Sequence, residues 1–212
     1  MKKSIDLSQV QVVSWDIDGT LYDLHILMSH FKKDLLRRMF SFGWIAAWRD
    51  FFRLLRFKRF MDKIRANAGN YDVPTVPNRQ AIEETQNEMY GRILPSIGLL
   101  PGVIELLEWL STQPVRQVVF SDYKATGKLN ALGVRDFFDT VFAGEELGHL
   151  KPSPAVFTKL TDALNIPPEA LLHIGDRPDT DGAAAPVVGF QAAIIGTDFA
   201  TAHDLLAALK KD

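Results

Sequence analysis

The sequence predicts an α/β fold, with a parallel sheet core, helices on both faces of the sheet, and one long helical insertion. Short apolar runs recur along the chain, as expected of buried parallel strands, at 10–15, 116–120, 140–143, 171–174 and 191–195. Helical patterns lie between these runs, which favours an α/β layer architecture. One long interval after the first run carries helical patterns alone.

The first apolar run, VQVVSW, is rich in β-branched residues and ends at the turn-forming sequence DIDGT. This is typical of a buried strand that ends at the edge of a parallel sheet. The run at 140–143 is the weakest of the five. Apolar residues at spacings of three and four predict helices at 103–111, 155–164 and 202–210. Pro154 precedes the second of these helices, as a first-turn proline does.

The interval from about residue 24 to about residue 97 breaks the alternation of strands and helices. Its pattern predicts three helices, separated by Gly43 and by the Gly69–Pro77 segment, at about 26–42, 44–67 and 78–91. We therefore expect a core domain formed by residues 1–22 and 98–212, and a helical domain formed by residues 23–97.

The composition excludes several classes of protein. The 212 residues are 47% hydrophobic and 24% charged, with a net charge of −2 and no cysteine. This is an ordinary globular composition, not that of a disordered chain or a disulfide scaffold. Without cysteine there is no thiolate zinc site and no cysteine nucleophile. The near-neutral charge argues against a uniformly basic nucleic-acid binder.

Neither the N-terminus nor the insertion is predicted to contain a membrane or export segment. Two lysines open the chain, but Asp6 and Gln9 break the apolar run that a signal peptide needs. The most apolar long segment, 42–57, contains four charged residues and cannot span a bilayer. We expect a soluble, cytoplasmic protein.

The near-zero net charge conceals a basic insertion. Residues 31–65 contain 11 Lys and Arg against three Asp, and nine aromatic residues lie among them. We favour an amphipathic helical arrangement, with aromatic side chains inside and basic ones in solvent. A second interpretation uses some of these cations and aromatics in a substrate pocket, for an extra anionic or aromatic group. A third makes the segment a surface for membrane or nucleic acid.

Polar residues follow the predicted strands, where open α/β sheets bind their ligands. The first strand ends in Asp16-Ile17-Asp18-Gly19-Thr20. One carboxylate there can attack phosphorus, and a second can protonate a leaving oxygen. Gly19 allows a ligand to approach the backbone closely. The alternative is an ordinary Asp-Gly turn.

Two further strand ends offer groups that suit a phosphate. The Ser121 hydroxyl can donate a hydrogen bond to a phosphate oxygen, although a helix cap is an equally good interpretation. Asp122 is most simply a cap or turn residue. Lys151, before Pro152, can neutralise a phosphate or a carboxylate cluster, and its alternative is a solvated surface lysine.

The fourth strand ends in Gly175-Asp176, with Asp179 and Asp181 close behind. Carboxylates are the hard oxygen ligands that Mg²⁺ prefers, and Asp176 could meet Asp16 across the sheet. The alternative is an acidic turn. We expect Arg177 to pair with a neighbouring aspartate rather than to contact substrate, and His173 to be a strand residue packed in the core.

Together these motifs resemble the haloacid dehalogenase-like hydrolase superfamily. The matching elements, in matching order and spacing, are DIDGT at 16–20, Ser121, KPSPAVF at 151–157 and GDRPDTDGAAA at 175–185. The resemblance covers residues 10–22 and 98–200, and it implies a Rossmann-like core. The insertion lies where phosphatase-type members carry a helical cap domain, between the first and second motifs.

The resemblance implies a role for each site residue. Asp16 would be the nucleophile and Asp18 the general acid and base. Ser121 would bind the transferred phosphoryl group, and Lys151 would hold Asp16 and the phosphoryl oxygens. Mg²⁺ would be ligated by Asp16, the backbone carbonyl of Asp18, and Asp176. Asp181 would support metal-bound waters or Lys151, or ligate the metal directly.

The expected activity is therefore that of a Mg²⁺-dependent phosphatase that acts on a small phosphorylated metabolite through an aspartyl-phosphate. Dehalogenase members lack the second aspartate, so Asp18 favours phosphoryl chemistry. To act as an acid, Asp18 must start protonated, so we expect its pKa to lie above that of Asp16. A phosphomutase and a non-catalytic binding protein are the alternatives. No other cofactor and no nucleic-acid or membrane partner is expected.

Overall fold

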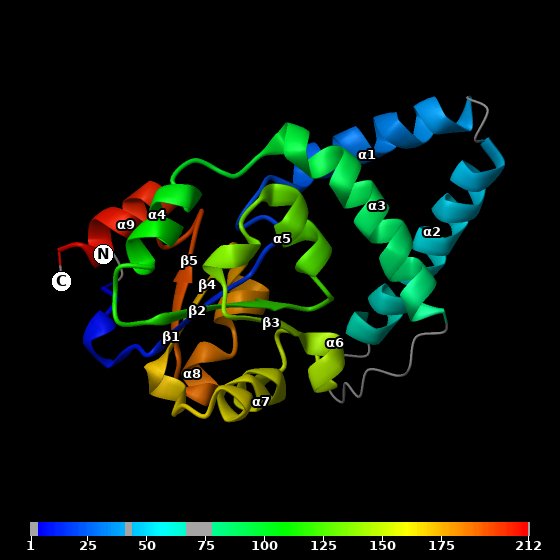
Figure 1. Cartoon of the computed structure of the whole chain (residues 1–212). Coiled ribbons are helices and arrows are strands. Elements are labelled where there is room, and N and C mark those ends of the chain that lie inside the picture. The colour runs from blue at the N-terminus through cyan, green and yellow to red at the C-terminus, as the bar shows by residue number, and fades with distance from the viewer. Residues whose placement is uncertain (1–3, 41–43, 67–77, 212) are drawn as a thin grey trace.

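A five-stranded parallel sheet forms the centre of the molecule (Figure 1). The computed structural model describes residues 4–40, 44–66 and 78–211. The strands are β1 (Val12–Trp15), β2 (Arg116–Ser121), β3 (Thr140–Ala143), β4 (Leu171–Gly175) and β5 (Gln191–Ile194). Their order is β3-β2-β1-β4-β5. All five predicted strands are confirmed, including the weak one at 140–143.

The register brings the ends of three strands to one edge of the sheet. Trp15, the last residue of β1, pairs with Val119 of β2 and with Ile174 of β4. Because the strands are parallel, the residues that follow them emerge side by side at the same edge. The motif residues of β1, β2 and β4 are therefore neighbours in space.

Helices cover both faces of the sheet, as predicted (Figure 1). On one face, α4 (Val103–Leu110), α5 (Thr126–Leu132) and α9 (Ala202–Leu209) share a hydrophobic core with Val13 and Trp15. On the other, α7 (Pro154–Leu164) and α8 (Ala185–Val188) pack with Val12. Successive residues of β1 point to opposite faces, and so this short strand contributes to both cores.

Short helices were missed and one long helix was predicted too short. The pattern did not predict α5 or α6 (Gly144–Leu147), because four to seven residues give too little periodicity to detect. In the insertion, α3 (Arg79–Ile97) continues beyond the predicted end at residue 91. It runs past Pro95, which has no N–H to donate, because burial of Ile93 and Leu94 in the core outweighs that loss.

The other insertion helices are α1 (Leu24–Met39) and α2 (Trp44–Ala66). The Asp23 carboxylate starts α1 by accepting the N–H groups of His25 and Ile26. The predicted helix ends at 42 and 67, and the predicted breaks at Gly43 and 69–77, lie outside the described residues.

The insertion contacts the core at two places. Near its root, Leu27 of α1 and Leu94 of α3 belong to the main hydrophobic core. Farther out, Phe57 and Ile82 pack with Leu150 of the core. The described helices thus pack against the sheet domain at both ends of α3. The division into domains at 1–22, 23–97 and 98–212 stays a prediction.

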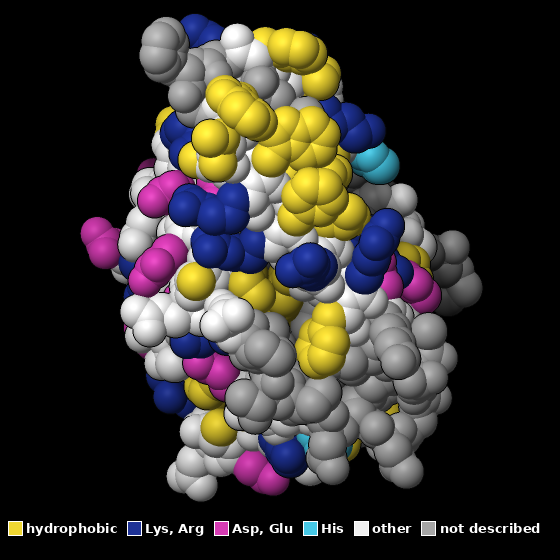
Figure 2. All heavy atoms as spheres, turned by 90° about the vertical axis from the view of Figure 1, so that its right-hand side faces the viewer, with side chains coloured by type: hydrophobic (Ala, Val, Ile, Leu, Met, Phe, Trp, Pro, Cys, Tyr) yellow, Lys and Arg dark blue, Asp and Glu magenta, His cyan; other side chains and the backbone are white. Residues whose placement is uncertain are grey.

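The outward face of the insertion combines hydrophobic and basic side chains, with few acidic ones (Figure 2). Phe57 is buried, as the amphipathic interpretation expects, but other aromatics of the insertion are exposed, namely Phe40, Trp44, Trp48 and Phe52. That interpretation is therefore wrong for these four residues, which the packing of α1 and α2 leaves uncovered. None of the described helices combines the length and the apolar character that crossing a bilayer requires.

Candidate active site

The DIDGT loop continues β1 directly into the site. The Asp16 N–H donates to the Ile174 carbonyl at 2.8 Å, so the backbone is still held by β4 at this residue. Its carboxylate is buried and accepts a hydrogen bond from the Thr20 hydroxyl at 3.4 Å. Gly19 adopts φ +93°, and a Cβ at this position would clash with the Asp176 carboxylate. The glycine therefore lets Asp176 approach the loop.

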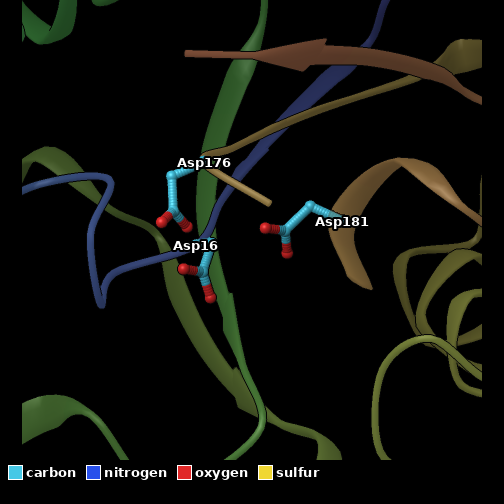
Figure 3. Close-up of side chains that lie close together, drawn as sticks. All are labelled: Asp16, Asp176 and Asp181. Carbon is cyan, nitrogen blue, oxygen red and sulfur yellow. The ribbon is translucent and has the colours of Figure 1, made fainter. Parts of the chain in front are cut away.

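Three carboxylates converge at this edge of the sheet. Asp16, from the loop after β1, and Asp176 and Asp181, from the segment after β4, point toward one another (Figure 3), and each offers an oxygen within 4.8 Å of the others. A side chain at Gly175 would clash with Asp181, so a second glycine makes room for the cluster. Three hard oxygen donors at this spacing fit the coordination preferences of Mg²⁺.

Lys151 lies between two of these carboxylates. Its Nζ donates to Asp16 Oδ1 and to Asp181 Oδ1, each at 2.6 Å, and only 4% of the residue is exposed. The alternative of a solvated surface lysine is wrong. Asp122 positions the lysine loop, because its carboxylate accepts the Lys151 N–H at 2.8 Å. The predicted role of Asp122 as a cap or turn residue does not include this contact, which joins residues 29 positions apart.

Asp181 already has several donors around it. Besides Lys151, the His173 Nε2–H lies 3.3 Å from Oδ1, and the Arg177 N–H donates to Oδ2 at 3.1 Å. His173 is fully buried in β4, which confirms the prediction, and its Nδ1 bonds to Ser14 Oγ at 2.8 Å. The Arg177 guanidinium pairs with Asp179 at 2.7 Å, as expected.

Asp18 has a partner that the sequence did not predict. Lys128 of α5 donates to both Asp18 oxygens, at 2.6 and 2.7 Å, and is itself only 4% exposed. The Tyr22 hydroxyl donates to the same carboxylate. No motif marks Lys128, since it lies in a short helix that the pattern did not predict. A buried lysine on an otherwise apolar helix face is visible only once the helix is placed.

The electrostatics of the two loop carboxylates are the reverse of those expected. Burial raises the pKa of Asp16 to about 7, with Asp181 and Asp18 adding to the effect and Lys151 opposing it. Burial also acts on Asp18, but the Lys128 ammonium and the Tyr22 hydroxyl outweigh it and hold its pKa below the usual value. The expectation that the Asp18 pKa lies above that of Asp16 is wrong for the protein alone, because Asp18 has Lys128 to itself whereas Asp16 shares Lys151 with the nearby Asp181.

The pKa values of Asp176 and Asp181 also shift in opposite directions. Burial and the nearby Asp181 raise the pKa of Asp176 to about 6. Asp181 is buried too, but Lys151 and the His173 hydrogen bond lower its pKa well below the usual value. Asp181 is thus the carboxylate that most readily carries the negative charge beside Lys151, while Asp16 and Asp176 hold protons more readily.

Ser121 ends β2 and is 3% exposed. Its hydroxyl makes no hydrogen bond with any residue that the structure describes. The helix-cap interpretation is wrong, because the residue that precedes α5 as its N-cap is Ala125. A buried hydroxyl at this edge of the sheet is therefore available to a ligand.

A cavity of about 500 Å³ opens beside the loop, between the insertion helices and the core. Asp18 and Lys128 form part of its wall, together with residues of α1, α2 and α3. Of the predicted site residues, the structure brings Asp16, Lys151, Asp176 and Asp181 into contact or close proximity. Asp18 lies apart from this group, in the wall of the cavity.

Known proteins resemble this chain in sequence. The sequence model of the haloacid dehalogenase-like hydrolases matches residues 10–189. The protein CbbY of Rhodobacter capsulatus is 24% identical over 212 residues, covering 94% of this chain and 91% of that protein. The glyceraldehyde 3-phosphate phosphatase of Methanopyrus kandleri is 24% identical over 183 residues, covering 81% and 78%.

Solved structures share the fold. The 2-haloacid dehalogenase of Pseudomonas syringae pv. Tomato DC3000 superposes with a TM-score of 0.62 at 20% identity, covering 95% of this chain and 99% of that one. At this identity the similarity establishes the architecture, a parallel sheet with a helical insertion after its first strand, and not the reaction.

Proposed function

The chain belongs to the haloacid dehalogenase-like hydrolase family, and from this membership we propose that it is a Mg²⁺-dependent phosphatase of a small phosphorylated metabolite. One observation carries the proposal. Two carboxylates from a single loop face different surroundings: Asp16 lies in the carboxylate and lysine cluster, and Asp18 lies on the cavity side. A nucleophile and an acid for the leaving group need this separation.

The two carboxylates divide the chemistry. The Asp16 carboxylate attacks phosphorus and forms an aspartyl-phosphate, while the bond from phosphorus to the ester oxygen breaks. Asp18 donates its proton to the departing oxygen and then takes a proton from the water that hydrolyses the aspartyl-phosphate. Lys151 and the Ser121 hydroxyl stabilise the charge on the phosphoryl oxygens.

Asp16 and Asp176, with the backbone carbonyl of Asp18, are the proposed Mg²⁺ ligands. The donor chemistry fits, since both side chains are carboxylates with oxygens in the cluster. When bound, Mg²⁺ supplies positive charge against the phosphoryl oxygens and favours the ionised form of Asp16. The oxygens of Asp181 already accept from Lys151 and Arg177, so we assign Asp181 to holding that lysine.

Charge from the substrate supports the acid role of Asp18. A phosphate dianion beside the loop favours the protonated form of Asp18, which the protein alone does not. The similarity to a glyceraldehyde 3-phosphate phosphatase supports phosphoryl chemistry. Dehalogenase members of the family lack the second aspartate, so the presence of Asp18 weighs against carbon–halogen cleavage.

The proposal is tested by a phosphate-release screen over phosphorylated metabolites, with and without Mg²⁺. The purified chain should release phosphate only with the metal, and Asp16→Asn, measured at equal concentration, should reduce release to background while keeping its circular dichroism spectrum. Activity in Asp16→Asn comparable to that of the parent would refute the mechanism. Little net release, but transfer of phosphate within a substrate, would indicate a mutase instead.

A further inference from the structure

We propose that the alcohol released by this phosphatase is a bulky apolar group, an alkyl chain or an aromatic ring, and not a sugar or a second anion. The inference rests on the proposed function and specifies its substrate class. It comes from the position and the lining of the cavity of about 500 Å³ between the insertion and the core.

The cavity lies where the leaving group must be. Asp18 forms part of its wall and is the proposed acid for the leaving oxygen. A carboxyl group can protonate only an oxygen within hydrogen-bond reach. The alcohol attached to that oxygen therefore extends away from Asp16, along the Asp18 side, into the cavity.

The wall of this cavity is predominantly apolar. Side chains from all three insertion helices line it, among them Leu27, Phe31, Leu35, Leu55, Phe57 and Met89. Besides its charged residues, the wall offers a sugar only Gln86, Tyr90 and Tyr123 as polar partners, so most sugar hydroxyls would lose their hydrogen bonds to water without replacing them. An alkyl or aryl group would gain free energy on leaving water.

Most lysines of the cavity wall already form ion pairs with acidic residues of the protein. Lys58 pairs with Asp62, Lys124 with Glu83 at 3.3 Å, and Lys128 with Asp18 at 2.6 Å. Among the described lining lysines, this leaves only Lys32, which is solvent-exposed. A second phosphate or carboxylate on the substrate would therefore find no free buried cation in the described wall.

The volume agrees with a large leaving group. Cavities of 300–1,000 Å³ are typical for ligands of drug-like size, far larger than a two- or three-carbon metabolite. Each methylene that moves from water into such a wall favours binding by about fourfold. Activity should therefore rise with the length of an alkyl chain until the cavity is filled.

The experiment compares linear alkyl phosphates from propyl to octyl with glyceraldehyde 3-phosphate and phosphoglycolate. We expect kcat/KM to rise by about fourfold per methylene over the first additions, and octyl phosphate to exceed both polar substrates at least about tenfold. Calorimetric binding of the matching alkylphosphonates, which are not hydrolysed, should show the same trend in Kd.

Variants of the wall locate the effect. Met28→Gln and Leu55→Gln place an amide in the cavity, and Ile45→Gln makes the same kind of change at an exposed position of α2 outside it. The two cavity variants should lose about tenfold in kcat/KM for octyl phosphate and less than about twofold for propyl phosphate, whereas Ile45→Gln should match the parent for both.

A flat or falling alkyl series, with the polar phosphates preferred, would overturn this inference and leave the proposed phosphatase activity intact. Equal losses for propyl and octyl phosphate in the cavity variants would also overturn it. Release of phosphate from none of the compounds, together with no binding of any phosphonate, would contradict the phosphatase proposal itself.

Discussion

At the residue scale, Asp16 and Asp18 are two positions apart and have opposite electrostatic surroundings. Asp16 shares Lys151 with Asp181, and its pKa is raised to about 7, whereas Asp18 has both oxygens on Lys128 and its pKa is lowered. The motif alone suggests two similar carboxylates. What separates them is the partner of each, and Lys128 is as important to that difference as the aspartates.

Replacing Lys128 tests this separation. In Lys128→Met the burial of Asp18 is no longer outweighed, so its pKa should rise from below the usual aspartate value to above it. A pH titration of carbon-13-labelled aspartate carboxyls by NMR measures it. Lys124→Met removes a lysine of the same cavity that does not contact Asp18, and should leave that pKa unchanged. Equal shifts in both variants would contradict the assignment.

Asp176 should destabilise the metal-free protein at neutral pH. Burial and Asp181 raise its pKa to about 6, so between about pH 4 and pH 6 the folded state binds more protons than the unfolded state. The free energy of unfolding therefore falls as the pH rises through this window, and the full cost of the charged carboxylate is present above it.

Asp176→Asn removes that cost. Without metal at pH 7.5, the variant should be more stable than the parent by about 1–2 kcal/mol, less than the full pKa difference implies because solvent screens the half-buried carboxylate, and the gain should be smaller at pH 4.5. Thermal unfolding measures both. Adding Mg²⁺ should raise the Tm of the parent and leave that of the variant nearly unchanged. A variant less stable than the metal-free parent at pH 7.5 would show that the raised pKa is wrong.

The site residues differ in how far the sequence predicts them. Asp16, Ser121 and Asp176 could be predicted because parallel strands end at one edge, and each residue directly follows or ends an apolar run. Lys128 and the hydrogen bond of His173 to Asp181 could not. Both depend on how a helix or loop packs against the sheet, and neither is marked by a local pattern.

At the element scale, the loop after β1 can bring Asp16 close to Asp176 because Gly19 has no side chain that would clash with the Asp176 carboxylate. Apolar runs located the five strands, and periodic apolar patterns located the six longest helices of the described residues. The end of α3 was not, because burial of Ile93 and Leu94 carries that helix past Gly91 and Pro95. Local propensity there conflicts with tertiary packing, and packing determines the outcome.

Gly19→Ala should therefore damage the carboxylate cluster. The variant carries both the strain of φ +93° and a clash with Asp176, so it should lose the Mg²⁺-dependent rise in Tm and at least about tenfold in kcat/KM. Gly196→Ala is the matched control. It has φ +85° with no atom near its Cβ position, and should cost about 1 kcal/mol of stability without affecting activity. Similar activity losses in both variants would mean that strain, and not contact with Asp176, is responsible.

At the scale of the whole molecule, the basic insertion is held over the acidic edge of the sheet by contacts between distant residues. Arg79 of α3 donates to Glu145 of α6, at 2.9 Å from Nε, and its guanidinium lies 5.2 Å from the Phe57 ring. The sequence predicted where the insertion occurs. It did not predict how the insertion lies over Asp18, since these contacts join segments far apart in the chain.

Arg79→Gln tests whether this pairing completes the cavity. Loss of the ion pair should weaken the hold of α3 on the core and raise KM about tenfold, with a smaller change in kcat, because the site at the sheet edge is untouched. Arg92→Gln removes an ion pair to Asp34 within the insertion, and should leave KM within about twofold of the parent. The reverse order of effects would contradict a role for the Arg79 contact.

The central claim is that the Asp16 carboxylate becomes covalently phosphorylated. Borohydride reduces an acyl phosphate to an alcohol, so an enzyme quenched with borohydride during turnover should carry homoserine in place of aspartate. Peptide mass spectrometry should find homoserine at position 16, dependent on both substrate and Mg²⁺, and leave Asp18 and Asp176 unmodified. Homoserine at another position, or none at position 16 while phosphate is being released, would contradict the account.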